Sequence, residues 1–459
     1  MTTSVHGPAQ ESVGRPRSRR ALLAGAAGNL IEWYEFGVYG YFATVIAATF
    51  FTPDGGSSLE GLVATYASFA LAFFFRPLGA VLFGRLGDRI GRRPALLLAL
   101  LLMTGATTLI GLLPDRAAIG AAAPWLLTLL RVLQGLSAGG EFGGAVSVLT
   151  EFAPPGRRGL YGAWQSFTVA LGLLAGAGTA ALTATVLSPA ALHAWGWRVP
   201  FLLALPLGVV ALLLRLRLEE TPAFQQARAA SAIATGPGDT GPRDTGAAPA
   251  AIAPDPRRLA GAVLLGAGRT MGWAAAGYTF LVVLPGYLQS TLHTTFRQAL
   301  VATVLANLGF AAAILPAGAL SDRIGRRAVM TTGAALAVVL AFPLLNLLQD
   351  AGSSSLARGT AVILAGAVVG LMAGPGPAML AEMFPVTVRC TGLGLAYSLA
   401  NAVFSGCAGL LVTELIKRTG NLDIPAYYVV LTCAVSVAAL LTLRGDDHRR
   451  PLRDDRTAG

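Results

Sequence analysis

Charged residues are scarce in this chain of 459 residues. Asp, Glu, Lys and Arg make up only 12% of it, whereas hydrophobic residues make up 54% and the mean hydropathy is +0.63. Soluble domains carry about 25% charged residues. A deficit sustained over this length argues against one large soluble core and predicts many membrane-spanning helices.

Cysteine and histidine are too few to support several classes of site. The three cysteines (Cys390, Cys407 and Cys433) and the four histidines are scattered, which argues against a disulfide framework and predicts no metal site. No phosphate-binding loop of the GxxxxGKS/T type occurs, so ATP-driven pumping has no motif here. No nucleophile–base pair stands out. We therefore expect neither an enzyme nor a resident cofactor.

The net charge of +11 does not indicate a nucleic-acid partner, because the arginines sit in short clusters between apolar runs. With the N-terminus inside, 25 of the 34 Lys and Arg residues fall on the inner side and six on the outer side. The remaining three, Arg76, Arg131 and Arg269, lie within apolar runs. This bias satisfies the positive-inside rule. We expect a multi-pass protein of the plasma (inner) membrane, surrounded by the lipid bilayer, with both termini cytoplasmic.

Twelve apolar runs are each long enough to cross a bilayer, which takes about 20 residues. Residues 1–20 and 444–459 form polar tails, and residues 218–258, rich in Ala, Gly, Pro, Thr and Asp, form a linker. The predicted fold is an all-α membrane protein with twelve transmembrane helices in two pseudo-symmetric six-helix bundles, 21–217 and 259–443. The twelve runs are 21–48, 60–84, 94–113, 122–149, 160–187, 198–217, 259–289, 298–320, 328–349, 358–382, 391–416 and 424–443.

A ten-residue motif occurs once in each half of the chain. It reads GRLGDRIGRR at Gly84–Arg93 and GALSDRIGRR at Gly318–Arg327, so that Asp88 and Asp322 lie 234 residues apart. Each copy stands between two apolar runs. Its glycines allow a close, tight turn, and we expect a short cationic loop on the cytoplasmic side.

A second motif, Glu-x-x-Pro-x-x-x-Arg, begins at Glu151 and again at Glu382, an offset of 231 residues. Two motifs at nearly one offset indicate a 6+6 internal repeat. We expect acids and arginines from both motifs to form a latch that closes the cytoplasmic side and releases as the halves move. The alternative is that the arginines only set topology. The predicted latch residues are Gly84, Asp88, Arg89, Arg92, Glu151, Asp322, Arg323, Arg326 and Glu382.

Ionised side chains within apolar runs are costly, and they indicate function. Glu32, Glu35 and Tyr39 share one face of the first run, with the two acids roughly 16–21 Å from its inner end. Arg131 and Gln134 of the fourth run lie at about the same depth. We therefore expect opposite charges to meet near the middle of the membrane.

Three further charges extend this set. Glu141 lies further inward on the fourth run, Arg76 lies nearer the inner surface on the second, and Arg269 on the seventh is level with Glu35 by depth and by repeat offset. We predict Glu35, Glu141 and Glu32 as proton-coupling residues. For the glutamates the open alternative is a permanent ion pair, and for the arginines it is hydrogen bonding between helices. The aromatic side chains of these runs could line the cavity or hold a quaternary amine, or they could only pack. The predicted substrate ligands are Arg131, Arg269, Arg76, Tyr39, Gln134 and Trp33.

A family resemblance rests on the duplicated motif, on RVLQGLSAGGE in the fourth run and on five further stretches. These are GNLIEWYEFGVYG (Gly28–Gly40), FFFRPLGAVLFGRLGDRIGRRP (Phe73–Pro94), GGEFGGA (Gly139–Ala145), GWRVPF (Gly196–Phe201) and LEETPAF (Leu218–Phe224). The chain resembles the major facilitator superfamily. More narrowly, it is similar to metabolite:proton symporters, which include α-ketoglutarate, citrate, shikimate and proline/betaine permeases.

The resemblance covers nearly the whole chain and implies uptake of a small metabolite with a proton by alternating access. It supports Glu32, Glu35, Arg76, Arg131 and Glu141 as functional residues.

Two departures from the family pattern bear on the substrate. Family members usually have EWYDF where this chain has Glu35, and Arg269 lies outside the pattern and favours an anionic group. We expect a monomeric, proton-coupled importer of a small carboxylate-bearing metabolite. The alternatives are a symporter for a zwitterion such as proline or betaine and a nutrient sensor that binds without translocating.

Overall fold

The computed structural model describes residues 15–53, 55–90, 92–139, 141–151, 153–216, 256–385, 388–444 and 449. Every regular element in these ranges is helical. We refer to residues 15–216 as the N-terminal half and to residues 256–444 as the C-terminal half. The predicted linker lies largely outside the described residues, as do residues 1–14 and most of the predicted C-terminal tail.

The helices follow the predicted apolar runs, some of them in two or more pieces. In the N-terminal half they are α1 (Arg15–Tyr41), α2 (Ala43–Ile46), the π-helix η1 (Ala47–Phe51), α3 (Ser58–Ile90), α4 (Arg92–Leu112), α5 (Arg116–Ile119), α6 (Ala122–Ala138), α7 (Glu141–Glu151), α8 (Arg158–Val186), α9 (Pro189–Ala191), the π-helix η2 (Leu192–Gly196), α10 (Arg198–Leu202) and α11 (Ala204–Leu216).

The C-terminal half repeats this pattern of long, partly broken helices. Its elements are α13 (Pro256–Tyr278), the π-helix η3 (Thr279–Val283), α14 (Leu284–Ser290), α15 (Phe296–Ile324), α16 (Arg326–Gln349), α17 (Ser355–Ala373), α18 (Gly376–Met383), α19 (Arg389–Ala400), the π-helix η5 (Asn401–Gly406), α20 (Ala408–Thr419) and α21 (Ile424–Leu441).

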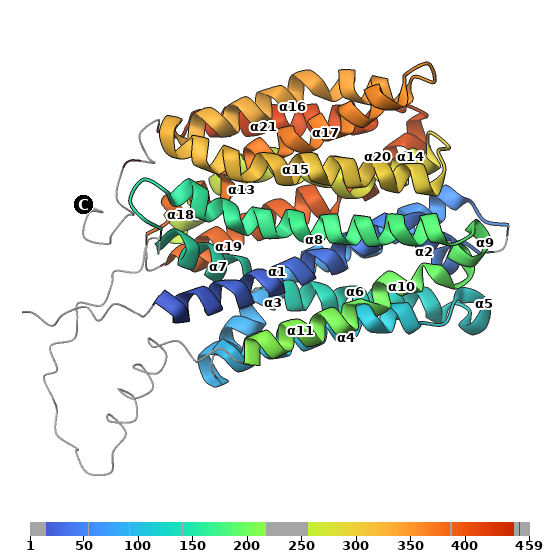
Figure 1. Ribbon diagram of the computed structural model, residues 1–459, viewed down its shortest axis with the longest axis horizontal. Coiled ribbons are helices and arrows are strands. Elements are labelled where there is room, and N and C mark those ends of the chain that lie inside the picture. The colour runs from blue at the N-terminus through green and yellow to red at the C-terminus, as the bar shows by residue number, and fades with distance from the viewer. Residues whose placement is uncertain are drawn as a thin grey trace, which may run out of the picture.

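The two halves lie beside each other with their long helices roughly aligned (Figure 1). Helices α15, α16, α17 and α21 lie on one side of the view, and α3, α4, α6 and α11 lie on the other. Helix α8 of the N-terminal half packs along α15 of the C-terminal half at the border between them.

Ten helical segments of the described chain are long and apolar enough to cross a membrane. They coincide with ten of the twelve predicted runs. The other two predicted runs are also helical, as α1 to η1 and as α6 with α7. These two carry the charged residues Glu32, Glu35, Arg131 and Glu141.

The ten-residue motif contains an even shorter turn than the short loop we predicted. In the second copy α15 continues to Ile324 and α16 begins at Arg326, so Gly325 alone makes the turn at φ 95°. A residue with a side chain is strained at this φ. In the first copy α3 continues to Ile90 and α4 begins at Arg92. The predicted short loop is thus a single-residue turn in the second copy, because helix-compatible residues stand on both sides of Gly325.

The N-terminal boundary also differs from the prediction. Helix α1 begins at Arg15, inside the segment 1–20 that we expected to be a polar tail. Four arginines in its first turns lower the hydropathy there, so the apolar run does not include them. Arginine is nevertheless a good helix former.

Helices α3 and α6 approach each other at three glycines. A Cβ atom added at Gly135 would overlap the carbonyl oxygen of Ala72, and one added at Gly139 would overlap that of Arg76. At Gly79 it would overlap the carbonyl oxygen of Leu136. Small residues allow such close packing in membranes. The contact fixes the backbone of Arg76 against the helix that carries Arg131.

We predict that Gly135→Ala destabilises the protein by about 1–3 kcal/mol, the usual cost of overpacking. The added methyl group must push α3 and α6 apart. The measurement is thermal unfolding of purified protein in detergent. The control is Gly105→Ala in α4, where a Cβ atom would meet nothing within 4 Å. Equal unfolding midpoints for the two variants would contradict the close contact.

Candidate functional site

Arg131 of α6 is fully buried among aromatic rings. Its Cζ atom lies 4.0 Å from the ring centroid of Tyr39 and 4.8 Å from that of Phe69. Nη1 donates to Gln134 Oε1 at 2.6 Å, whereas Nε and Nη2 have no hydrogen-bond partner among the described residues. Arginine keeps its charge in proteins, and a buried donor without a partner is costly. Arg131 therefore presents two donors that an acceptor can satisfy.

A chain of hydrogen bonds joins Arg131 to Glu35. Gln134 Nε2 donates to Thr107 Oγ1 at 2.6 Å, and Thr107 Oγ1 in turn donates to Glu35 Oε2 at 2.7 Å. Thr104 Oγ1 donates to the other carboxyl oxygen at 3.3 Å. Glu35 has no exposed surface. The predicted meeting of Glu35 with Arg131 thus occurs through two intervening side chains rather than by a direct ion pair.

Arg76 and Glu32 form a second buried pair next to the first. Arg76 Nη2 lies 3.4 Å from Glu32 Oε1. The Arg76 Cζ atom lies 4.3 Å from the ring centroid of Phe73, 4.4 Å from that of Phe36 and 5.4 Å from that of Trp33. Aromatic faces attract a guanidinium ion in this range. We refer to Glu32, Glu35, Arg76 and Arg131 as the charge cluster.

A small cavity lies beside the charge cluster, between the two halves. The cavity volume is about 30 Å³, far below the roughly 300–1,000 Å³ of a pocket that holds a small ligand. A metabolite can therefore enter only if the surrounding side chains move apart. The residues that line it are Trp33, Ser166, Val169, Leu173, Thr270, Trp273, Ala274, Gly277, Tyr278, Leu281, Val282, Phe310, Tyr397, Asn401 and Ser405.

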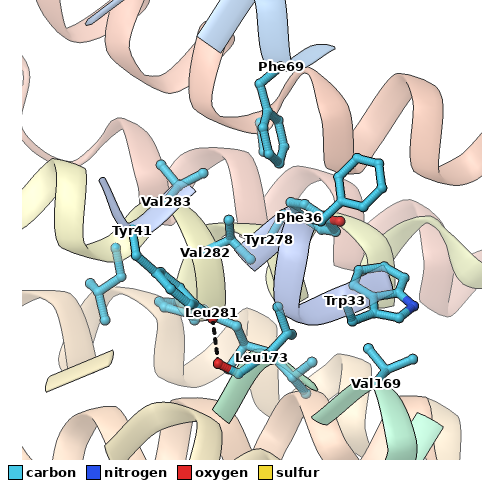
Figure 2. Packing of buried hydrophobic residues seen from close by; sticks show 14 of the residues in the cluster. Trp33, Phe36, Tyr41, Phe69, Val169, Leu173, Tyr278, Leu281, Val282 and Val283 are labelled. Carbon is cyan, nitrogen blue, oxygen red and sulfur yellow. Dashed lines mark hydrogen bonds between the residues drawn. The ribbon is translucent and has the colours of Figure 1, made fainter. Parts of the chain in front are cut away.

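Aromatic rings from both halves meet in this region. Figure 2 shows Trp33, Phe36 and Phe69 of the N-terminal half around Tyr278 of the C-terminal half. Tyr39 is held in place by a 2.6 Å hydrogen bond between its hydroxyl group and Ser68 Oγ. Trp33 and Tyr39, both predicted as substrate ligands, are thus brought to the charge cluster.

Arg269 is directed to a different helix. Its Nε donates to Ala439 O at 3.3 Å and its Nη2 donates to Thr442 Oγ1 at 2.8 Å. Both acceptors lie at the end of α21 or directly after it. These contacts favour helix-to-helix bonding, the alternative to a ligand role. The depth of a residue and the repeat offset predict its level in the membrane. They do not predict the direction in which its side chain points from the helix.

The predicted latch acids pair with arginines of the opposite half. Glu151 Oε1 of α7 accepts from Arg389 Nη1 of α19 at 2.7 Å. Reciprocally, Glu382 Oε1 of α18 lies 3.4 Å from Arg158 Nη1 of α8. The acid and the arginine of each Glu-x-x-Pro-x-x-x-Arg motif therefore bind their counterparts in the other motif.

Asp322 adds a third contact between the halves. Its carboxylate accepts from the backbone N–H groups of Gly159 at 2.7 Å and Leu160 at 2.9 Å, in the first turn of α8. A carboxylate at a helix N-terminus satisfies free N–H groups and the helix dipole. Arg326 connects this contact to the ion pairs, because it binds Asp322 at 2.8 Å and Glu382 at 3.1 Å. We refer to Glu151, Arg158, Asp322, Arg326, Glu382 and Arg389 as the latch.

Some predicted residues do not join these sites or lie outside the described side chains. Arg323 is exposed on α15. The surroundings of the following residues lie outside the described part of the structure: Glu141, Gly84, Asp88, Arg89 and Arg92.

Four functional candidates were missing from the predicted set. Thr104 and Thr107 bind Glu35, and their signal was their polarity within the apolar run at 94–113. Arg158 and Arg389 complete the latch. They were recognised as parts of the repeat, but a repeat alone does not show that its two copies bind each other.

Polar contacts also join the halves at the opposite end of the molecule. Thr44 Oγ1 donates to Gln289 Oε1 at 2.8 Å, and Lys417 Nζ lies 3.2 Å from Glu60 Oε1. Contacts between the halves are therefore present at both ends of the molecule.

Comparison with known proteins places this chain in a family. The family described as "Major Facilitator Superfamily" matches residues 259–459, and the one described as "Sugar (and other) transporter" matches residues 21–241. A proline/betaine transporter of Escherichia coli (strain K12) is 34% identical over 435 residues, which cover 95% of this chain and 85% of that protein. This chain belongs to the major facilitator superfamily. It is a secondary transporter and not an enzyme.

Other relatives of this facilitator are named for different solutes. A citrate-proton symporter of Salmonella typhi is 35% identical over 442 residues and covers 96% of each chain. An alpha-ketoglutarate permease of E. coli (strain K12) is 34% identical over 425 residues and covers 92% of this chain and 93% of the relative. Among solved structures, a D-xylose-proton symporter superposes with a TM-score of 0.72 at 19% identity and covers 92% of this chain and 97% of that chain. This last likeness confirms the fold.

The latch of this facilitator can be tested with a cross-link. Cys390 Sγ of α19 lies 3.2 Å from Ser147 Oγ of α7, a separation that a disulfide of about 2 Å can close after small shifts. We predict that oxidation of the Ser147→Cys variant joins the halves and stops transport, and that a reductant restores it. Wild-type protein given the same oxidant is the control. Normal transport by fully cross-linked protein would show that the latch need not open.

Proposed function

We propose that this facilitator imports a small carboxylate-bearing solute together with a proton. The observation that carries this proposal is the buried Arg131, whose Nε and Nη2 lack partners among the described residues while its Nη1 is connected to Glu35. A guanidinium group binds a carboxylate strongly and with defined geometry. The proposed substrate ligands are Arg131, Gln134 and Tyr39, with Arg76 and Trp33 beside them.

Charge balance explains why a proton would accompany the solute. The charge cluster holds two arginines and two glutamates, so its formal charge is zero when all four are ionised. A carboxylate that binds Arg131 adds one negative charge to a buried site, which is costly unless it is compensated. A proton taken up by Glu35 restores the balance. Glu35 is therefore the proposed proton carrier, and Glu32 is the proposed permanent partner of Arg76.

The hydrogen-bond chain offers a route for coupling. A carboxylate bound at Nε and Nη2 of Arg131 draws the guanidinium group toward itself and weakens the bond from Nη1 to Gln134. A shift of Gln134 then changes its bond to Thr107, which in turn binds Glu35. Proton and solute would then leave together once the latch opens. This arrangement supports symport over independent binding of the two cargoes.

We infer twelve membrane crossings with both termini on the cytoplasmic side of the plasma membrane, in a monomer. Two observations support this topology: α1 begins and α11 ends at the end of the molecule that carries the latch (Figure 1). In addition, Arg327, next to the latch, donates to Leu443 O at 3.4 Å, beyond the end of α21.

A zwitterion with a quaternary ammonium group is a second candidate substrate. The cavity wall includes Trp33, Trp273, Tyr278 and Tyr397, and it has no acidic residue among its described lining residues. Aromatic faces bind such a cation without an acid. A zwitterion still has a carboxylate that can bind Arg131. The two candidate substrates therefore share the group that binds the arginine and differ in the group that occupies the cavity.

The proposal predicts that uptake into proteoliposomes depends on an inward proton gradient. Citrate, α-ketoglutarate, proline and glycine betaine form the test panel. Glu35→Gln should abolish gradient-driven accumulation while leaving exchange of solute across the membrane, because the amide cannot carry the proton. Accumulation that persists after the gradient is collapsed would contradict symport. Binding without any uptake would favour a sensor.

We predict that Arg131→Gln weakens solute binding by at least about 30-fold, since removing one partner of a buried charge pair costs about 2 kcal/mol or more. Titration calorimetry on purified protein measures this change. Arg269→Gln is the matched control, because it removes a buried arginine whose hydrogen bonds go to α21, and its affinity should stay within about twofold. The reverse ranking of the two variants would exclude Arg131 as the carboxylate ligand.

A further inference from the structure

We propose that the hydroxyl group of Tyr278 completes the carboxylate site from the C-terminal half, so that the bound anion connects the two halves. This inference rests on the proposed function, and it adds a residue that is absent from the predicted substrate ligands. Arg131 and Arg76 belong to the N-terminal half, whereas Tyr278 ends α13 of the other half.

The first observation is an unsatisfied hydroxyl group. Tyr278 is 6% exposed, and its hydroxyl has no hydrogen-bond partner among the residues that the structure describes. A buried tyrosine hydroxyl nearly always has a partner. The π-helix η3 follows directly, and such irregular turns within helices frequently mark functional sites.

The second observation is where the ring lies. Its centroid is 5.3 Å from that of Phe73 and 6.0 Å from that of Phe69. The guanidinium group of Arg76 packs on the Phe73 ring, and that of Arg131 packs on the Phe69 ring. Figure 2 shows Tyr278 facing Phe36, Phe69 and Trp33.

The third observation is that several buried donors around these rings lack an acceptor. Arg131 Nε and Nη2, Arg76 Nε and the Tyr278 hydroxyl are all buried, and all lack a hydrogen-bond acceptor in the described part of the chain. A carboxylate accepts about four hydrogen bonds at its two oxygens. One carboxylate can therefore satisfy donors from α3, α6 and α13 together, which no described side chain does.

The consequence concerns the closed state. When the halves separate at either end, Tyr278 moves relative to the arginines, and the anion loses one of its donors. Binding energy that is available only when the halves enclose the solute favours the occluded state. Tyr278 would thus make closure dependent on a carboxylate and discriminate against solutes that lack one.

The test compares Tyr278→Phe with Tyr34→Phe. The tightest binder among citrate, α-ketoglutarate, proline and glycine betaine serves as the probe, and titration calorimetry gives its affinity. Tyr278→Phe should weaken binding by about tenfold or more, the usual effect of a lost hydrogen bond to a charged group. Tyr34→Phe removes a hydroxyl that donates to Pro200 O at 2.7 Å, so its affinity should not change.

Thermal unfolding of the solute-free variants provides an independent readout. Removing an unsatisfied buried hydroxyl should leave the unfolding midpoint of Tyr278→Phe equal to or above that of the wild type, whereas Tyr34→Phe should unfold at a lower temperature. Unchanged affinity in Tyr278→Phe, together with lost affinity in Arg131→Gln, would overturn this inference alone. Unchanged affinity in both variants would overturn the carboxylate site itself.

Discussion

The neutrality of a buried charge cluster is the constraint on which the proposed mechanism depends. Two arginines and two glutamates lie within the membrane-spanning part, and each would be costly by itself. The rings of Phe36, Phe69, Phe73 and Tyr39 exclude water and hold the guanidinium groups at 4.0–5.1 Å. Any added charge in such surroundings must be compensated at once. Cotransport of an anion and a proton satisfies that constraint.

In the proposed mechanism the latch meets a different requirement, since it holds one end of the molecule together and then releases it. Its ion pairs cross between the halves in both directions, and Asp322 reaches the N-terminus of α8. A partly buried ion pair contributes little net stability because desolvation offsets attraction. Such contacts can specify one closed arrangement without making it too stable to open. The close contacts of α3 with α6 lie within one half, so they can persist while the latch opens.

Much of this arrangement could be predicted from the sequence, because charge in an apolar run is a strong signal. The repeated motifs and apolar runs predicted the superfamily fold. Glu35 and Arg131 were predicted at one level, where hydrogen bonds through Gln134 and Thr107 connect them, and the roles of these residues and of the latch stay predictions. Direction around a helix could not be predicted, so Arg269 was expected at the site although its hydrogen bonds go to α21. Thr104, Thr107 and Tyr278 were missed or undervalued, because threonine and tyrosine are common in membrane helices and gain meaning only from their neighbours. The single-residue turn at Gly325 likewise depends on packing.

The most direct test of the central claim is the number of protons that the purified protein takes up when it binds a carboxylate solute. A pH indicator in weakly buffered detergent solution gives this number at saturation, above the pH at which the solute itself binds protons. The mechanism predicts about one proton for each solute whose carboxylate binds Arg131, and none in Glu35→Gln. Saturating binding of an anionic solute without proton uptake, or unchanged uptake in that variant, would contradict the mechanism.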